Sequence, residues 1–213
     1  LSSVVNAFTI PPPPSGSRAI PISSKYVLVL WNLVKGVENY DLYRSSSLNG
    51  KFELLKSNLN SLGYNDETVT CEKNFYYKVK SFSNGKQSEF SPLATATTPS
   101  AIPSTPTNLV SELNNEGKGI KLTWGATDCG KSYNIYRSTN ASNFEQISTT
   151  KNLEFTDRSL EGGKKYSYKV AGVSQTGEGA LSAETKSLLS APSHPESLVN
   201  TSTDSAHIGL KWN

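Results

Sequence analysis

The chain has 213 residues, of which 35% are hydrophobic and 18% charged, and its formal net charge is +3. This composition suits one or two globular domains with modest cores. The lysines and arginines are dispersed, which argues against a nucleic-acid partner, and no run of about 18 uncharged apolar residues predicts insertion into a membrane. Two cysteines and two histidines are too few for a disulfide-rich scaffold or a structural zinc site, so we expect no metal and no cofactor.

The first segment, Leu1 to Ile10, precedes a run of four prolines. It is in phase with two later segments that also precede a proline, residues 90–103 and 181–192. Two interpretations stay open: residues 1–12 are the last strand of a preceding unit, or they are an extended leader of the first unit. Because the chain opens on a leucine and contains no methionine, we expect it to be a segment of a longer protein.

An internal repeat organises the rest of the chain. Trp31, Trp124 and Trp212 each close a short alternating run, with spacings of 93 and 88 residues. Nine residues after the first two tryptophans come Tyr40 and Tyr133, which open the segments YDLYRS and YNIYRS. Further on, residues 64–79 align without a gap on residues 155–170, at an offset of 91.

The signals inside each copy are those of β-strands. Apolar residues alternate around each tryptophan, after each YxxYR segment opens and again in residues 75–79 and 166–170, so that one face of every run is apolar. Asn-Gly and Gly-Gly pairs separate the runs. We therefore predict an all-β chain of tandem antiparallel β-sandwiches, with the core markers Trp31, Trp124, Tyr40, Tyr133 and Tyr166. The predicted domains are residues 13–100 and 101–192, and residues 193–213 are predicted to be the first strands of a truncated third unit.

These motifs carry a family resemblance. A tryptophan on the second strand, Tyr-x-(Leu/Ile)-Tyr-Arg on the third and Tyr-x-Tyr-x-Val on the sixth resemble tandem fibronectin type III domains, which have an immunoglobulin-like topology. The wording YNIYRS is similar to the bacterial extracellular variety of these domains. The resemblance covers nearly the whole chain and implies an extracellular or cell-surface location, but fold and function separate easily.

No constellation in the sequence predicts catalysis. Neither histidine lies in a complete unit, so a hydrolytic triad lacks its base. Two acidic pairs are available, Asp66 with Glu67 and Glu178 with Glu184, but the sandwich reading puts them in turns or on solvated faces. We expect no enzymatic activity and no catalytic residues.

Exposed aromatic residues offer the one candidate binding face. The outward positions of the third and sixth strands are Asp41, Tyr43, Tyr76 and Lys78 in the first copy and Asn134, Tyr136, Ser167 and Lys169 in the second. Because the resemblance places these strands side by side, Tyr43 is expected to pair with Tyr76. A face of Tyr43, Tyr76, Lys78 and Tyr136 would then contact a polysaccharide or a surface protein. The alternative is a cross-strand pair that simply stabilises the sheet.

The resemblance also implies two features of the turn before the sixth strand. Tyr166 occupies the place of the family's tyrosine corner, where a hydroxyl bonds back to the preceding turn, whereas the first copy has Phe75 there. Cys71 lies in the equivalent turn of the first copy, and Cys129 lies between strands two and three of the second. The implied topology puts both at one junction, which predicts an inter-domain disulfide in an oxidising compartment; two free thiols are the alternative.

We therefore expect a non-catalytic spacer or scaffold segment of a multidomain extracellular protein, whose partners are the other domains of the same longer chain. Two alternatives stay open: an adhesion module that uses the Tyr43/Tyr76 face, and a filament subunit that assembles through unpaired terminal strands. Asn140 and Asn200 each begin an Asn-x-Ser glycosylation pattern, whose use the sequence does not decide.

Overall fold

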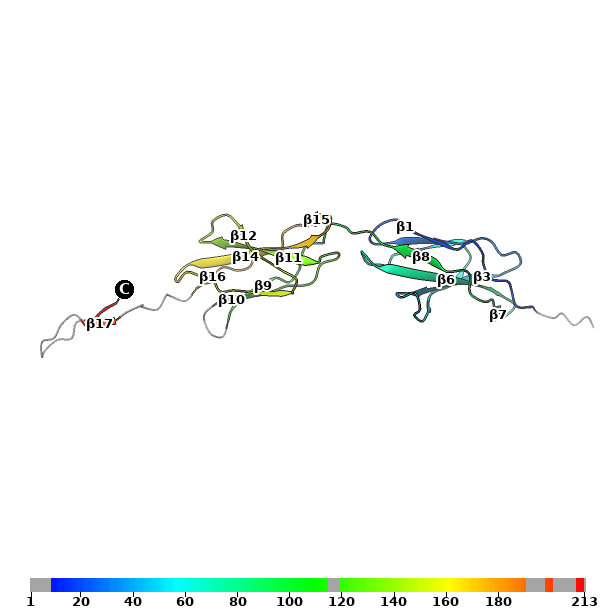
Figure 1. The fold of residues 1–213 in the computed structure, drawn as a ribbon, viewed down its shortest axis with the longest axis horizontal. Coiled ribbons are helices and arrows are strands. Elements are labelled where there is room, and N and C mark those ends of the chain that lie inside the picture. The colour runs from blue at the N-terminus through cyan, green and yellow to red at the C-terminus, as the bar shows by residue number, and fades with distance from the viewer. Residues whose placement is uncertain (1–8, 115–118, 191–197, 201–209, 213) are drawn as a thin grey trace, which may run out of the picture. The chain divides into compact units, whose positions relative to one another are not determined.

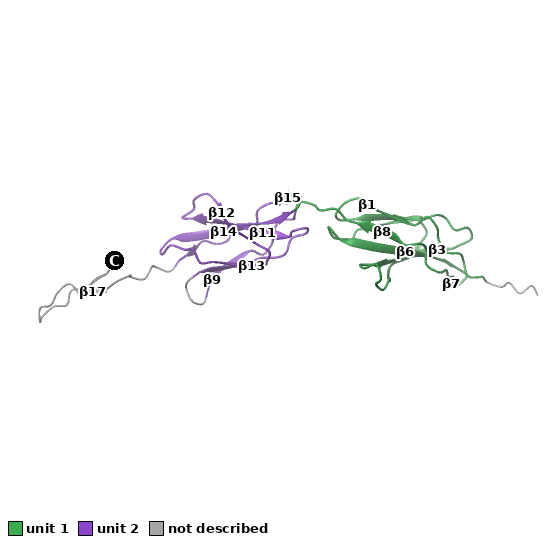
Figure 2. Ribbon diagram, viewed as in Figure 1, with its two compact units in different colours: residues 1–102, 175–177 green, residues 103–174, 178–213 purple. Residues whose placement is uncertain are grey.

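The computed structural model describes residues 9–114, 119–190, 198–200 and 210–212. Every regular element in these ranges is a β-strand, which confirms the all-β prediction. The chain forms two compact units, here called unit 1 (residues 1–102 and 175–177) and unit 2 (residues 103–174 and 178–213; Figure 2). No helix in the described ranges is long and apolar enough to cross a membrane.

Unit 1 is a sandwich of two antiparallel sheets (Figure 1). One sheet has the order β1-β2-β5, and the other has the order β4-β3-β6-β7, with β8 also paired to β6. The strands are β1 (Arg18–Pro21), β2 (Val27–Leu30), β3 (Asn39–Ser45), β4 (Glu53–Leu59), β5 (Gly63–Asp66), β6 (Asn74–Ser83), β7 (Lys86–Gln87) and β8 (Ala94–Thr97).

Unit 2 repeats this topology. Its sheets have the orders β13-β10-β9 and β12-β11-β14-β15, with β16 paired to β14. The strands are β9 (Val110–Leu113), β10 (Ile120–Thr123), β11 (Ser132–Thr139), β12 (Glu145–Thr150), β13 (Glu154–Asp157), β14 (Lys165–Ser174), β15 (Gly177–Glu178) and β16 (Leu188–Leu189).

Each unit has a core of its own, built from the inward-facing half of the alternating pattern. Strand β6 shows the rule, since its residues alternate strictly between buried and half-buried positions after Asn74. An aromatic pair fills the centre of each core: the Trp31 and Tyr40 ring centroids lie 5.6 Å apart, and those of Trp124 and Tyr133 lie 5.5 Å apart. All five core markers predicted from the sequence are buried: Trp31, Tyr40, Trp124, Tyr133 and Tyr166.

Both units interrupt the same ladder. The pairing of β3 with β4 shifts register between Tyr40 and Leu42 and again between Leu42 and Tyr43, and that of β11 with β12 shifts between Ile135 and Tyr136. A bulge of this kind bends the strand and increases its twist. The two copies of the sequence repeat therefore also share a bulge in the equivalent pair of strands.

The structure describes two strands near the C-terminal end of the chain but almost none of the N-terminal segment. Strands β17 (Leu198–Asn200) and β18 (Leu210–Trp212) form an antiparallel pair, in which Leu198 lies opposite Trp212. Their assignment to a truncated third unit stays a prediction, as do the domain bounds. The expected terminal strand at Leu1 to Ile10 lies almost entirely outside the described residues.

Candidate functional site

A buried carboxylate cluster lies inside unit 1. Asp66 ends strand β5 and is 0% exposed, because the ladder pairs it with the inward-facing Val27 of β2. Its Oδ1 accepts hydrogen bonds from the Thr68 backbone N–H (3.0 Å) and hydroxyl (2.7 Å). Its Oδ2 accepts from Arg44 Nη1 (2.7 Å) and from the Tyr77 hydroxyl (2.9 Å).

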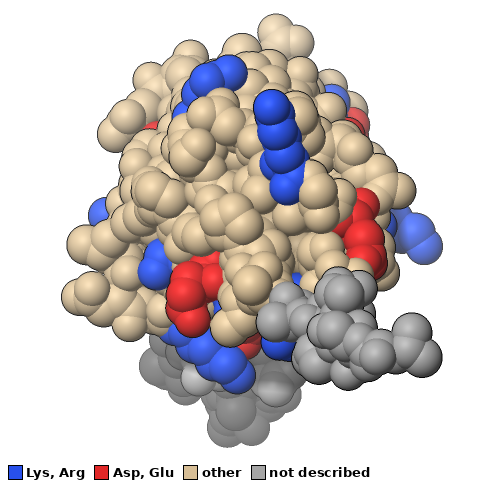
Figure 3. Space-filling model, turned by 90° about the vertical axis from the view of Figure 1, so that its right-hand side faces the viewer, with Lys and Arg blue, Asp and Glu red and all other residues tan. Residues whose placement is uncertain are grey.

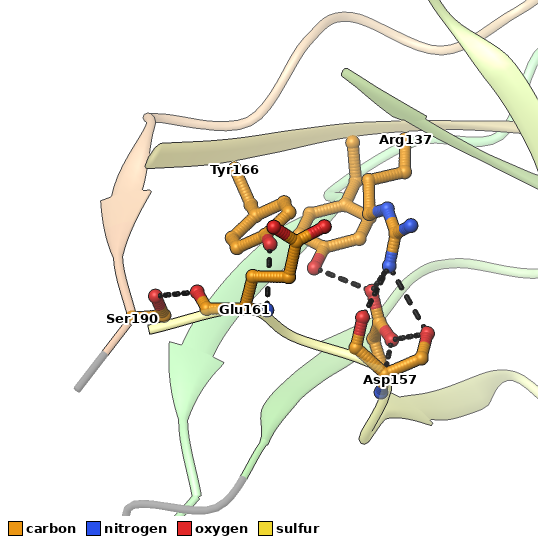
Figure 4. Close-up of polar contacts among 7 residues, drawn as sticks. Arg137, Asp157, Glu161, Tyr166 and Ser190 are labelled. Atoms are coloured by element: carbon orange, nitrogen blue, oxygen red, sulfur yellow. Dashed lines mark hydrogen bonds and ion pairs between the residues drawn. The ribbon is translucent and has the colours of Figure 1, made fainter. Parts of the chain in front are cut away.

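Unit 2 holds the same cluster at equivalent positions (Figure 4). Asp157 is 2% exposed, and its Oδ1 accepts from the Ser159 backbone N–H (2.9 Å) and hydroxyl (2.8 Å). Its Oδ2 accepts from Arg137 Nη1 (3.0 Å) and the Tyr168 hydroxyl (2.9 Å). The arginine comes from strand β11 and the tyrosine from β14, so the cluster ties one sheet to the other.

The surroundings fix the charge states of these groups. Burial raises the pKa of Asp66, but hydrogen bonds from Thr68, Arg44 and Tyr77 outweigh it, so that the pKa lies below its ordinary value. Burial, reinforced by the Asp66 carboxylate, raises the pKa of the Tyr77 hydroxyl. Because Asp66 lies in strand β5 and is fully buried, the expectation that it lies in a turn or on a solvated face is wrong. Each of its oxygens already accepts two hydrogen bonds, which gives the carboxylate a structural role.

The predicted tyrosine corner is present in unit 2. The Tyr166 hydroxyl accepts a hydrogen bond from the Glu161 backbone N–H (2.8 Å), and the Ser190 hydroxyl donates to the Glu161 carbonyl (2.5 Å; Figure 4). In unit 1, Phe75 has no hydroxyl to offer. The Thr98 hydroxyl nevertheless donates to the Thr70 carbonyl (2.6 Å), as Ser190 does in the other unit. The bond to the Tyr166 hydroxyl is thus specific to unit 2, whereas the hydroxyl-to-carbonyl bond occurs in both units.

The outer face of the five-stranded sheet in unit 1 carries an aromatic and cationic cluster. Lys78 Nζ lies 4.5 Å from the ring centroid of Phe52 and 5.4 Å from that of Phe90. Lys80 Nζ lies 4.5 Å from the Phe90 centroid, and the Tyr43 ring meets Phe90 edge-on at 5.1 Å. We call these five residues the lysine–phenylalanine face. All five side chains are half-buried.

The arrangement of this face differs from the expected tyrosine pair. The ladder places Tyr43 opposite Lys78 and Tyr76 opposite Ser45, so the ring that contacts Tyr43 is Phe90. Two outward positions are also buried, contrary to expectation. In unit 1, Asp41 is buried and its carboxylate accepts hydrogen bonds from the Asn58 N–H and from Gln87 Nε2. In unit 2, Ser167 is buried.

Unit 2 presents a different face at the equivalent strands. The Tyr136 hydroxyl donates to Glu178 Oε1 (2.7 Å), and Asn134 Nδ2 donates to the same oxygen (3.2 Å). Burial and this carboxylate raise the pKa of the Tyr136 hydroxyl. Lys169 Nζ lies 4.4 Å from the Phe144 centroid. The predicted binding residues therefore sit on two faces, with Tyr43, Tyr76 and Lys78 in unit 1 and Tyr136 in unit 2.

On the face shown in Figure 3, basic and acidic side chains are interspersed in small groups among uncharged ones, and neither sign dominates. This agrees with the dispersed lysines and arginines of the sequence. Among the described residues, no group of three or more His, Cys, Asp or Glu side chains is placed to hold a metal ion.

A hollow of about 540 Å³ opens beside the turn between β3 and β4 in unit 1, next to Ser47, Leu48 and Asn74. In unit 2 the matching turn is one residue shorter and closes onto β14. There the Asn140 backbone N–H donates to the Lys165 carbonyl (2.8 Å), and Asn140 Oδ1 accepts from the Lys165 N–H (2.9 Å).

Both cysteines, Cys71 and Cys129, are disulfide-bonded, and neither is a free thiol. Since the chain contains two cysteines, each is the partner of the other. Disulfides of this kind persist in oxidising compartments.

Sequence reasoning found the cysteines, the core markers and the tyrosine corner, but it missed Phe52, Phe90 and Lys80. It also missed the buried carboxylate clusters. The repeat held a signal for these clusters, because Asp66 and Tyr77 recur 91 residues later as Asp157 and Tyr168. A carboxylate, a tyrosine and an arginine that repeat together indicate a shared internal contact.

The chain is similar to several solved structures. The chicken CNTN1 FN1-FN3 domains align with 96% of this chain and 76% of their own, at 17% identity and a TM-score of 0.60. An Fn3-like protein from Clostridium thermocellum is 28% identical over 44% of this chain and 98% of its own, with a TM-score of 0.40. The structure of FN3tt mut is 24% identical over 43% of this chain and 99% of its own, with a TM-score of 0.38. No protein-family model and no curated protein matches the chain.

The alignment with the chicken domains, together with the sheet orders of both units, establishes the class of the molecule. The chain has the fibronectin type III fold in tandem, as its sequence motifs predict. At 17% identity this likeness defines the fold alone.

Proposed function

We propose that the chain is a non-catalytic spacer and scaffold segment of an extracellular multidomain protein. The observation that carries this proposal is that each unit closes a hydrophobic core of its own, within a single chain. Modules that fold on their own can be strung together without sharing a core, and a string of them sets the reach between whatever lies at its two ends.

The buried polar groups support a structural role. The Asp66 and Asp157 carboxylates are saturated by hydrogen bonds from their own unit, and the arginines beside them are committed to the same contacts. A general acid or base needs an accessible proton position, which these groups lack. The strongly shifted titratable groups are thus explained by internal architecture.

The segment between the units supports a semi-rigid connection. The sequence TPSAIPSTP spans residues 98–106 and contains three prolines, which restrict the backbone and favour an extended linker. The disulfide between Cys71 and Cys129 would further restrict this joint in an oxidising, extracellular compartment. The mechanical function is then to limit the range of distances and angles between attached domains.

The test is a distance distribution between the units. Spin labels are introduced as unnatural amino acids at the exposed positions Ser57 and Lys151, so that the native cysteines stay untouched. A spacer should give a narrow distribution by pulsed electron resonance, and the distribution should broaden on reduction and in the Cys71→Ser/Cys129→Ser variant. A distribution that is equally broad in oxidised and reduced protein would contradict the proposal.

A further inference from the structure

The lysine–phenylalanine face of unit 1 holds two cations that lack an anionic partner. Among the residues that the structure describes, no carboxylate oxygen forms an ion pair with Lys78 or Lys80. The rings of Phe52 and Phe90 fix the two ammonium groups instead, at 4.5 and 4.5 Å from the nearer centroid. A cation over a ring face keeps its N–H groups available on the side away from the ring.

The acidic residue opposite Lys80 in the pairing of β3 with β6 is Asp41, and its carboxylate already accepts other hydrogen bonds. Asp41 lies opposite Lys80 on strand β3, but it is 9% exposed. Its Oδ1 accepts from the Asn58 N–H (3.0 Å) and its Oδ2 from Gln87 Nε2 (2.5 Å). The ammonium groups of Lys78 and Lys80 therefore remain available to an anion from outside the unit.

Unit 2 shows that the sheet does not require this arrangement. At an offset of 91 residues, Lys80 is replaced by Ala171, Phe90 by Leu181 and Gln87 by Glu178. The remaining cation, Lys169, shares its face with the carboxylate of Glu178. The excess positive charge is thus a property of unit 1 and not of the fold.

We propose that the lysine–phenylalanine face binds an extended acidic peptide whose carboxylates occupy alternate positions. Lys78 and Lys80 are two residues apart on one strand, so their side chains repeat at about 6.6–6.8 Å along the sheet. An extended peptide with acidic residues at positions i and i+2 has the same repeat. Leu54 lies opposite Tyr43 and is 54% exposed, which offers an apolar contact beside the cations.

The same geometry disfavours a neutral sugar. A saccharide that stacks on an aromatic platform needs a free ring face, but the ammonium groups of Lys78 and Lys80 already cover Phe52 and Phe90. The recognition therefore rests on charge complementarity. This binding role goes beyond the spacer function and does not depend on it.

The experiment titrates the full chain with the peptide acetyl-Glu-Val-Glu-Val-Glu-amide at about 50 mM salt, and follows backbone amide and lysine side-chain NMR signals. Lys78→Gln and Lys80→Ala, the latter copying unit 2, should each weaken binding by about 2–5-fold, as expected for exposed charge pairs. The matched control Lys169→Gln should leave affinity unchanged. Binding should fall steeply at 0.5 M salt because screening shortens the range of the charges.

Three results would overturn the proposal. The first is equal affinity for acetyl-Glu-Glu-Val-Val-Glu-amide, which has the same composition but no two glutamates at positions i and i+2. The second is tighter binding of an oligogalacturonate, which would make the partner an acidic glycan. The third is no loss of affinity in either lysine variant while its amide spectrum shows that unit 1 is folded.

Discussion

The two units share a buried aspartate cluster and differ on the outer faces of their larger sheets. Both bury an aspartate under an arginine, a tyrosine and a hydroxyl residue, with donor–acceptor distances between 2.7 and 3.0 Å in each. On the outer sheet face, unit 1 presents two cations over phenylalanine rings, whereas Glu178 accompanies the one cation of unit 2. The interior cluster serves the fold, and the face is where the copies acquired individual properties.

The largest expected effect tests whether the two clusters are equivalent. Asp66→Ala and Asp157→Ala each leave a buried tyrosine hydroxyl and an arginine without their acceptor, which should lower the free energy of unfolding of the affected unit by about 2–4 kcal/mol. Urea titrations that follow the indole N–H signals of Trp31 and Trp124 report each unit separately. Glu67→Gln, on the exposed residue beside Asp66, is the control and should cost little. A large loss in one unit alone would break the equivalence.

The pH dependence of unfolding also compares the Asp66 cluster of unit 1 with the Asp157 cluster of unit 2. The folded-state pKa values of Asp66 and Asp157 lie below the ordinary value of 3.8, so the unfolded chain takes up protons first as pH falls. The contribution of each carboxylate is complete well above pH 3.8 and is lost as pH falls below it through the folded pKa. Unfolding monitored at pH 7, 5, 4 and 3 should therefore show both units weakening only below about pH 4. Asp66→Asn and Asp157→Asn should each remove part of that slope from one unit.

The tyrosine corner is the interior feature that the units do not share. Tyr166→Phe removes the acceptor of the Glu161 N–H and should destabilise unit 2 by about 1–1.5 kcal/mol. The reciprocal Phe75→Tyr variant supplies a hydroxyl near the equivalent turn and should stabilise unit 1 by up to about 1 kcal/mol. Thermal unfolding of the pair measures both signs. A destabilised Phe75→Tyr protein would show that the turn of unit 1 has no place for a hydroxyl.

The smallest expected effect concerns two turns with left-handed backbone. Ala141 has φ of 61°, a conformation that costs a residue with a Cβ, whereas Gly85 has φ of 72° in the Asn84-Gly85 turn. Ala141→Gly should stabilise unit 2 by about 0.5–1 kcal/mol. Gly85→Ala is the reverse substitution and should destabilise unit 1 by a similar amount. An added Cβ at Gly85 meets nothing within 4 Å, so the whole cost comes from the left-handed backbone conformation. Equal signs for the two variants would contradict this account.

The fold was predictable because its signals are local and occur twice. Alternation around Trp31 and Trp124, and the YxxYR segments that follow, indicate strands without knowledge of any long-range contact. The burial of Asp66 was not predictable in this way, because its acceptor role depends on Arg44 from a strand that is 22 residues away in sequence. Taken by itself, the sequence NDET of residues 65–68 predicts a polar turn.

The binding face was predicted only in part for the same reason. Tyr43 and Lys78 come from strands whose proximity the resemblance implies, and they are indeed opposite each other. Phe52 precedes β4, and Phe90 lies in a segment after β7 where the Ser88 and Ser91 N–H groups donate to β6 carbonyls. Their approach to Lys78 therefore depends on contacts between segments that are far apart in the sequence. The expected Tyr43–Tyr76 pair and the observed Tyr43–Lys78 pair differ by two residues of register. Alternation cannot detect this difference, because it fixes the face of a residue and not its partner.

The irregular outer ladders have a consequence for a chain built from repeated sandwiches. An unbroken edge strand is a template onto which another polypeptide can add, and a tandem array would offer many such templates at high concentration. Here the outer strands β4 and β12 are joined to their neighbours across bulges. The opposite edge of each sheet is divided between two short strands, β7 and β8 beside β6 in unit 1 and β15 and β16 beside β14 in unit 2. Edges that are kinked or very short resist sheet-to-sheet aggregation, which suits a sandwich that occurs in tandem within one chain.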